Sequence, residues 1–198
     1  MTRYRRCDDG GQAFPIYITV VGGLLLLAFA YFAVGQAGAN RNGAQTAADA
    51  AALAAAQDLR DQLADKWVAD MLTPAKWQDI FDGRATELEP SCRRADQLAA
   101  RNDARVLGCT PEGLLGFRVE VQTNRPVGDS IVDGTEDWKS VAEATAVVEP
   151  RCTFEVPAEG NRDTLPPLTC EHRVWDLDPE QLDDIPEAHD LFDVHLAD

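Results

Sequence analysis

The apolar pattern of the chain changes character twice between residues 14 and 73. Residues 14–34 (FPIYITVVGGLLLLAFAYFAV) are predominantly apolar and carry no charge. Such a run is long enough to cross a hydrocarbon core of about 30 Å at 1.5 Å per residue, which predicts a transmembrane helix. Alanine then dominates from residue 44 to residue 56. Beyond it, large apolar residues recur every fourth position, a spacing typical of an amphipathic helix: Leu59, Leu63, Trp67 and Met71.

These stretches are expected to form one continuous helix. No proline lies between Pro15 and Pro74, and alanine has the highest intrinsic helix propensity. The predicted helix has about 55 to 60 residues and a length of roughly 85 Å, and Pro74 ends it. The expected division is a cytoplasmic N-terminus at residues 1–13, the transmembrane segment at residues 14–34, and its alanine-rich extracytoplasmic continuation at residues 35–73.

Flanking charges indicate the orientation of the chain. Arg3, Arg5 and Arg6 precede the apolar run, whereas only Arg41 follows it closely. The positive-inside rule therefore places the N-terminus in the cytoplasm and the rest of the chain outside the membrane. A cleaved signal peptide is the competing interpretation, because residues 37–39 (AGA) resemble a signal peptidase site. The run is longer than the usual apolar region of about 7 to 15 residues, which favours a retained anchor.

Small residues form a stripe along the alanine-rich helix. They recur every fourth position, at Gly35, Ala39, Gly43, Ala47, Ala51 and Ala55. Small side chains allow a second helix to approach closely, so the stripe predicts side-by-side packing with another membrane protein. The residues assigned to this packing surface are Gly35, Ala39, Gly43 and Ala47. Membrane lipid is the other expected partner of the helix.

Residues 74–170 are predicted to form a small α+β head. Phe117, Val119 and Val121 alternate with polar residues, as expected for a strand with one face on a core. Residues 140–150 and 151–156 supply two further expected strands of an antiparallel sheet. Residues 92–104 (CRRADQLAARNDA) predict a short helix, with Ser91 as its N-cap.

The cysteines divide into one before the apolar run, Cys7, and four after it. An even number outside the membrane fits disulfides in an oxidising compartment. Four cysteines allow three pairings. Pairing of neighbours, Cys92 with Cys109 and Cys152 with Cys170, is preferred. A helix rising from Cys92 and a strand returning to Cys109 would bring these two together, and closing such a loop stabilises a fold by about 3 kcal/mol.

The overall charge is strongly acidic, with 34 acidic and 18 basic side chains, which disfavours nucleic acid as a partner. Acidic residues are concentrated in residues 171–198, which are predicted to form a tail. Its apolar residues suggest docking on the head or on another subunit. Five of its carboxylates fit ligand positions of a calcium loop: Asp176, Asp178, Glu180, Asp184 and Glu187. Gln181 stands where the sharp turn of such a loop needs glycine, so no metal site is expected.

The sequence lacks the common motifs that carry enzymatic chemistry. There is no G-x-S-x-G elbow, no phosphate-binding G-x-x-x-x-G-K loop and no pair of cysteines at zinc spacing. The four outer cysteines are expected to be oxidised rather than reactive. The sequence therefore predicts no enzyme, no catalytic residue, no metal and no cofactor.

The first quarter of the chain resembles a known family. The motif DDGGQAFP at residues 8–15, the apolar run and the motif AQTAADAAALAAAQ at residues 44–57 are similar to TadE/TadG-like proteins of the Tad (Flp) pilus assembly machinery, which is related to type IV pili and type II secretion. The sequence of the alanine-rich motif is most similar to the TadG-like N-terminal region. Pro15 and Ile16 stand where prepilin peptidase substrates usually carry glutamate, so the chain resembles the uncleaved TadG-like members.

The resemblance implies a protein anchored in the inner membrane, with a pilin-like outer portion that serves pilus assembly or forms a minor filament component. Two other hypotheses remain open. The first is an anchored extracytoplasmic binding or sensing module, dependent on calcium through the acidic tail. The second, less favoured, is an anchored cell-wall hydrolase.

Overall fold

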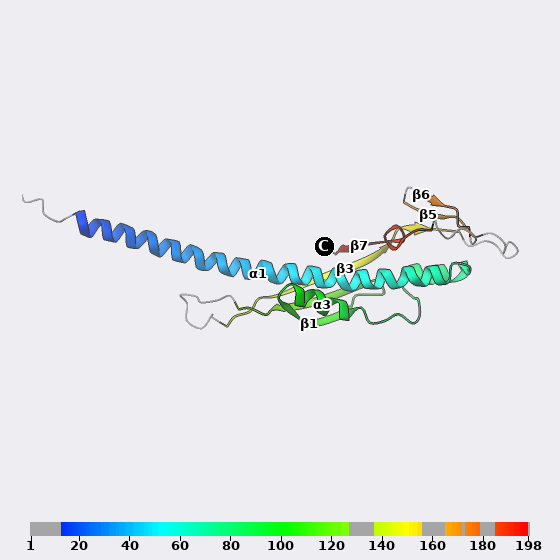
Figure 1. Ribbon diagram of the computed structural model, residues 1–198, viewed down its shortest axis with the longest axis horizontal. Helices are drawn as coiled ribbons and strands as arrows, with labels where there is room; N and C mark the ends of the chain where they lie inside the picture. The colour runs from blue at the N-terminus through cyan, green and yellow to red at the C-terminus, as the bar shows by residue number, and fades with distance from the viewer. Residues whose placement is uncertain (1–12, 127–136, 156–164, 172, 179–184, 198) are drawn as a thin grey trace, which may run out of the picture.

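The protein is a long helix that carries a small α+β head along its C-terminal part (Figure 1). The computed structural model describes residues 13–126, 137–155, 165–171, 173–178 and 185–197. Most of the predicted cytoplasmic N-terminus, including Cys7, lies outside these residues. The term "head" is used below for the described residues from Asp70 to Ala197.

Helix α1 (Ala13–Ala69) has 57 residues and no break, as the absence of proline predicted. It ends a few residues before Pro74, the first residue of the short helix η1 (Pro74–Lys76). Within residues 14–34 the large apolar side chains are between 38% and 83% exposed, because no part of the described chain covers them. Transfer of these side chains from water to an apolar environment would be favourable by a free energy of about 25 cal/mol per Å² of apolar surface.

The head is built around a four-stranded antiparallel sheet of order β1-β2-β3-β7. The remaining helices and strands flank it. The strands of this sheet are β1 (Ala104–Pro111), β2 (Gly116–Thr123), β3 (Val141–Pro150) and β7 (Phe192–Leu196), and the helices are α2 (Trp77–Phe81), α3 (Cys92–Arg101) and α4 (Ala188–Leu191). A second sheet contains β4 (Cys152–Thr153), β5 (Leu168–Cys170) and β6 (Arg173–Trp175).

One face of the main sheet packs on α1. Phe117, Val119 and Val121 of β2 are buried, as their alternation predicted, while the intervening Arg118 and Glu120 are exposed. The large apolar residues spaced four apart on α1 are buried as well, from Leu59 to Met71. The core therefore lies between α1 and the sheet, which confirms the predicted α+β class.

Both disulfides connect the predicted neighbours. Cys92 at the start of α3 bonds Cys109 of β1, and Cys152 of β4 bonds Cys170 of β5. The first bond ties α3 to the edge strand of the main sheet, and the second closes the smaller sheet. The four extracytoplasmic cysteines of the prediction are thus paired with one another.

Ser91 does not cap α3 as predicted. Its backbone is already helical (φ −74°, ψ −15°) and its side chain makes no capping hydrogen bond. Ser91 is only 3% exposed, and its hydroxyl oxygen accepts a hydrogen bond of 3.2 Å from the Nε2 of Gln62 on α1. A buried hydroxyl needs a partner, and here the long helix supplies it.

The C-terminal segment docks on the head, which is one of the two alternatives that its apolar residues suggested, and it does not form the separate tail that its acidic composition favoured. Strand β7 pairs with β3, with Phe192 opposite Pro150. Leu191 is 0% and Phe192 1% exposed, and the Phe192 ring lies 5.2 Å from the ring of Phe81. The acidic Asp193 points to solvent between these contacts. Burial of Leu191 and Phe192, together with the pairing of β7 with β3, holds the segment in the sheet despite its charge.

Candidate assembly surface on the long helix

The predicted packing residues Gly35, Ala39 and Gly43 lie on a part of α1 that the head leaves free. All three are exposed. A Cβ atom added at Gly35 or Gly43 would meet no atom of another element within 4 Å. Small side chains on an uncovered helix permit the close approach of a second helix. These three residues are called the free small-residue surface below.

Ala47 belongs to a different surface. It is 0% exposed, as are Ala51 and Ala55, because the head of the same chain covers them. A step of four residues exceeds one helical turn by about 40°, so a stripe with this spacing winds round the helix. It leaves the free side after Gly43 and passes under the sheet. The predicted packing residue Ala47, and the stripe beyond it at Ala51 and Ala55, therefore pack within the described part of the chain and are not exposed to a second helix.

Asn40 marks the point where the head first meets the helix. Its Nδ2 donates to the carbonyl oxygens of Arg125 (3.2 Å) and Pro126 (3.3 Å), which follow β2. Its Oδ1 accepts from the backbone nitrogen of Ser140 (3.3 Å), just before β3, and lies 3.3 Å from the Oγ1 of Thr123. One side chain thus fastens both ends of the β2–β3 connection to α1.

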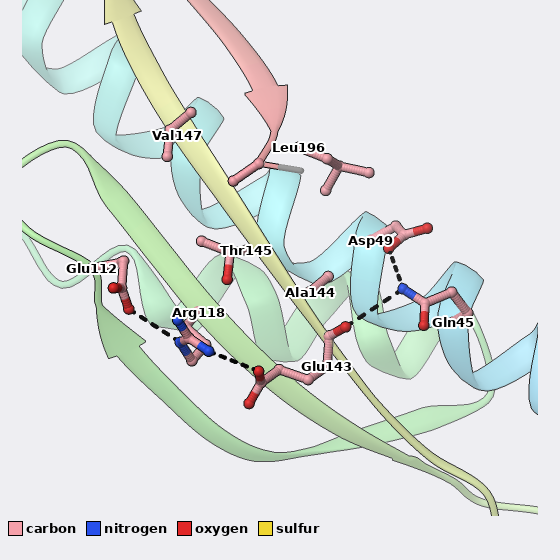
Figure 2. Close-up of a pocket in the computed structure, with 10 residues that line it drawn as sticks. Gln45, Asp49, Glu112, Arg118, Glu143, Ala144, Thr145, Val147 and Leu196 are labelled. Carbon is pink, nitrogen blue, oxygen red and sulfur yellow. Dashed lines mark hydrogen bonds and ion pairs between the residues drawn. The ribbon is translucent and has the colours of Figure 1, made fainter.

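A groove of about 650 Å³ lies beside α1, where β3 continues past the end of β7 (Figure 2). Gln45 and Asp49 of α1 line one side. The Gln45 Nε2 donates to Asp49 Oδ1 (2.8 Å) and to the carbonyl oxygen of Glu143 on β3 (3.5 Å). Leu196 of β7 lies at the other end of the groove. The groove is therefore lined by residues of α1 and of three strands of the main sheet, β2, β3 and β7.

Arg118 of β2 lies between two carboxylates near this groove, as Figure 2 shows. Its Nε is 3.1 Å from Glu112 Oε2, and its Nη1 is 2.9 Å from Glu143 Oε1. Hydrogen bonds to Glu112 and Glu143 raise the pKa of Arg118 above its usual value, so the guanidinium stays charged. This ion-pair network neutralises Glu143, which directly opposes Glu120 across the sheet.

Metal ligands do not gather in the described part of the chain. No group of three or more His, Cys, Asp or Glu side chains there is placed to hold an ion. Of the calcium-loop positions, Glu180 and Asp184 lie outside the described residues. The candidate functional features are instead the free small-residue surface and the head, which Asn40 attaches to α1 next to that surface.

Sequence reasoning identified the free small-residue surface but missed Asn40. Asparagine lowers helix propensity relative to alanine and favours caps and turns. An asparagine in the interior of a helix is a weak signal of a tertiary hydrogen bond. Asn42 gives the same signal and is exposed, so the sequence alone does not single out Asn40. The groove had no such signal, because β7 joins β3 only through contacts distant in sequence.

A comparison with known families gives one match. Residues 11–58 match the family described as putative Flp pilus-assembly TadE/G-like. The matched segment, about a quarter of the chain, includes the apolar run, the free small-residue surface and the alanines covered by the head. No curated protein and no solved structure matches the chain. The match shows that residues 11–58 are similar to this family, and it supports a pilus-associated role for the chain.

Proposed function

We propose that the protein is a membrane-anchored, non-enzymatic component of a Tad-like (Flp) pilus or a related secretion apparatus. It acts in pilus assembly or as a minor pilin-like subunit. The observation that carries the proposal is the division of the family-matching segment. Its first part is an exposed apolar helix, and its last part is packed under the head of the same chain.

The exposed apolar run at residues 14–34 of α1 supports membrane anchoring. The helix is long and apolar enough to span a bilayer near the N-terminus. Its large side chains between residues 14 and 34 have no protein cover among the described residues, and lipid supplies the cover they need. The proposed orientation places the N-terminus in the cytoplasm and the head outside. Two disulfides in the head support an oxidising compartment.

Contact with other pilus proteins is proposed to occur through the free small-residue surface. Gly35, Ala39 and Gly43 lie between the apolar run and the first covered alanine, Ala44. A partner helix that leaves the bilayer beside α1 meets this surface before it meets the head. Van der Waals packing of small residues then holds the two helices together.

Site-specific photo-crosslinking in the native membrane tests this contact. A photoreactive residue at position 39 faces the proposed partner helix. The same residue at position 37, which replaces another exposed alanine, lies roughly on the opposite side of α1 and is the matched control. The expected result is a protein adduct from position 39 that exceeds the adduct from position 37 several-fold.

A second arm uses leucine. Replacing Gly35 and Gly43 by leucine adds bulk to the free surface without touching the head, and the adduct at position 39 should be lost. Equal adducts from positions 37 and 39, or an adduct that persists in the leucine variant, would contradict packing at this surface.

A further inference from the structure

The end of the head where β2 ends and β3 begins lies on the side of the apolar part of α1. Strand β2 runs toward this end and β3 runs away from it, on the side of the head nearest the N-terminal half of the helix (Figure 1). Asn40 fastens the two strand ends there, through the carbonyl of Arg125 and the nitrogen of Ser140. The height of this end above the membrane is therefore set by the position of Asn40 on α1.

That height is small. Asn40 follows residue 34, the end of the apolar run, by six residues, or about 9 Å along the helix axis. The headgroup layer on each side of a bilayer is about 5 to 7 Å thick. Trp138 precedes Ser140 by two residues, which allows a reach of up to about 7 Å in extended chain. The Trp138 ring is thus within reach of the headgroup layer.

Trp138 has the chemistry of a residue at a membrane surface. Its side chain is 67% exposed, although tryptophan is usually well buried in a folded protein. The other three tryptophans, Trp67, Trp77 and Trp175, are 0%, 0% and 6% exposed. An indole combines an apolar ring with a polar N–H, so tryptophan is enriched where a bilayer meets water.

Charged neighbours of Trp138 suit the same environment. Lys139 is exposed and next in sequence, and Arg125 lies at the other strand end with an 84% exposed side chain. Arg125 pairs with Asp103 at 2.7 Å, and Asp137 is exposed beside Trp138. Charged groups of both signs therefore lie next to Trp138 in the sequence and at the neighbouring strand end, and such groups can interact with the phosphate and the ammonium of a phospholipid headgroup. The long aliphatic stems of lysine and arginine can lie along apolar surface while their charges reach phosphate.

We propose that Trp138 inserts into the phospholipid headgroup layer and makes the β2–β3 end of the head a second membrane contact. Asn40 is the positioning residue, because it fixes this end to α1. The protein then contacts the membrane at two points, α1 and Trp138, which restricts the tilt of the head relative to the bilayer. This inference rests on the proposed membrane anchoring.

Tryptophan fluorescence in vesicles tests the contact. Full-length protein is reconstituted in phosphatidylcholine vesicles with ordinary or brominated acyl chains, and vesicle flotation is measured on the same samples. Bromine quenches only tryptophans close to the lipid. Because one of four tryptophans is proposed to lie there, up to about a quarter of the emission should be lost in brominated vesicles. Trp138→Phe, which alters only an exposed side chain, should abolish this loss.

The outcomes separate the two proposals. Protein that floats with the vesicles but shows no quenching, or the same quenching in Trp138→Phe, overturns the Trp138 contact and leaves the anchor intact. Protein that does not float overturns the anchor and with it this inference. Asn40→Ala adds a third arm. It should float as the wild type does but lose at least half of the quenching, because the strand ends are no longer fastened. Unchanged quenching in Asn40→Ala would overturn its positioning role.

Discussion

Replacing Ala51 by leucine tests why the family-matching segment is rich in alanine. Ala51 is 0% exposed, and so are its neighbours on the covered side of α1, Ala47, Ala48, Ala52 and Ala55. Because their side chains end at Cβ, the sheet can approach the helix closely. Leucine adds three carbon atoms at a position where no space remains. The helix and sheet must then move apart, or the new side chain must adopt a strained rotamer.

The expected cost is about 1 to 3 kcal/mol for adding bulk to a packed core. For a folded unit of roughly 150 residues, each kcal/mol lowers the melting temperature by about 2 to 4 °C. Ala51→Leu should therefore melt about 2 to 12 °C below the wild type. Ala39→Leu is the matched control: it makes the same chemical change on the same helix at an exposed residue, and its melting temperature should stay within about 1 °C.

Thermal unfolding of the full-length protein in detergent micelles measures this difference. The near-ultraviolet circular dichroism of the buried Trp67 and Trp77, whose ring centroids are 5.5 Å apart, reports on the packing of the head. Close packing of the sheet on the alanines would be refuted if Ala51→Leu melted with the wild type. It would be refuted equally if Ala39→Leu lost as much stability as Ala51→Leu.

Three further predictions concern the head. Replacing Cys92 and Cys109 by serine should lower the free energy of unfolding by about 3 kcal/mol in urea titrations, because the bond closes a loop of 17 residues; an unchanged urea midpoint would contradict this. Gly83→Ala should cost about 1 to 2 kcal/mol by the same titration, since φ is +72° there and the new Cβ would lie 2.7 Å from a Leu115 methyl group; equal stability would argue against that backbone conformation. Phe192→Ala should cost about 3 to 5 kcal/mol in thermal unfolding, whereas a C-terminal segment detached from the core would give no change.

Regular spacing of large residues made most of the fold predictable. The recurrence from Leu59 to Met71 and the alternation of Phe117, Val119 and Val121 each leave one geometry that buries the apolar side chains together. The disulfide pairing was predictable for a related reason: a helix and the strand that follows it return the chain to its starting point. In both cases the information is local in the sequence.

The packing partner of the alanines could not be predicted in this way. Small residues at a spacing of four suit a second helix and a covering sheet equally well. The winding of the stripe places Gly43 on the free side of α1 and Ala47 under the head, and only the position of the sheet decides where the change occurs. The position of the C-terminal segment could not be predicted either, because Phe192 is buried through contacts with β3 and Phe81, which are remote in sequence.

Filament assembly in the native host tests the central claim most directly. The chromosomal copy of the gene is deleted, and surface filaments are counted by electron microscopy after complementation with the wild type, with the triple variant Gly35→Leu, Ala39→Leu and Gly43→Leu, or with the control Ala37→Leu. We expect filaments to be lost on deletion, to return with the wild type and with Ala37→Leu, and to stay absent with the triple variant even though it reaches the membrane with its disulfides formed. Normal filaments in the deletion strain would contradict the proposed role in the pilus apparatus.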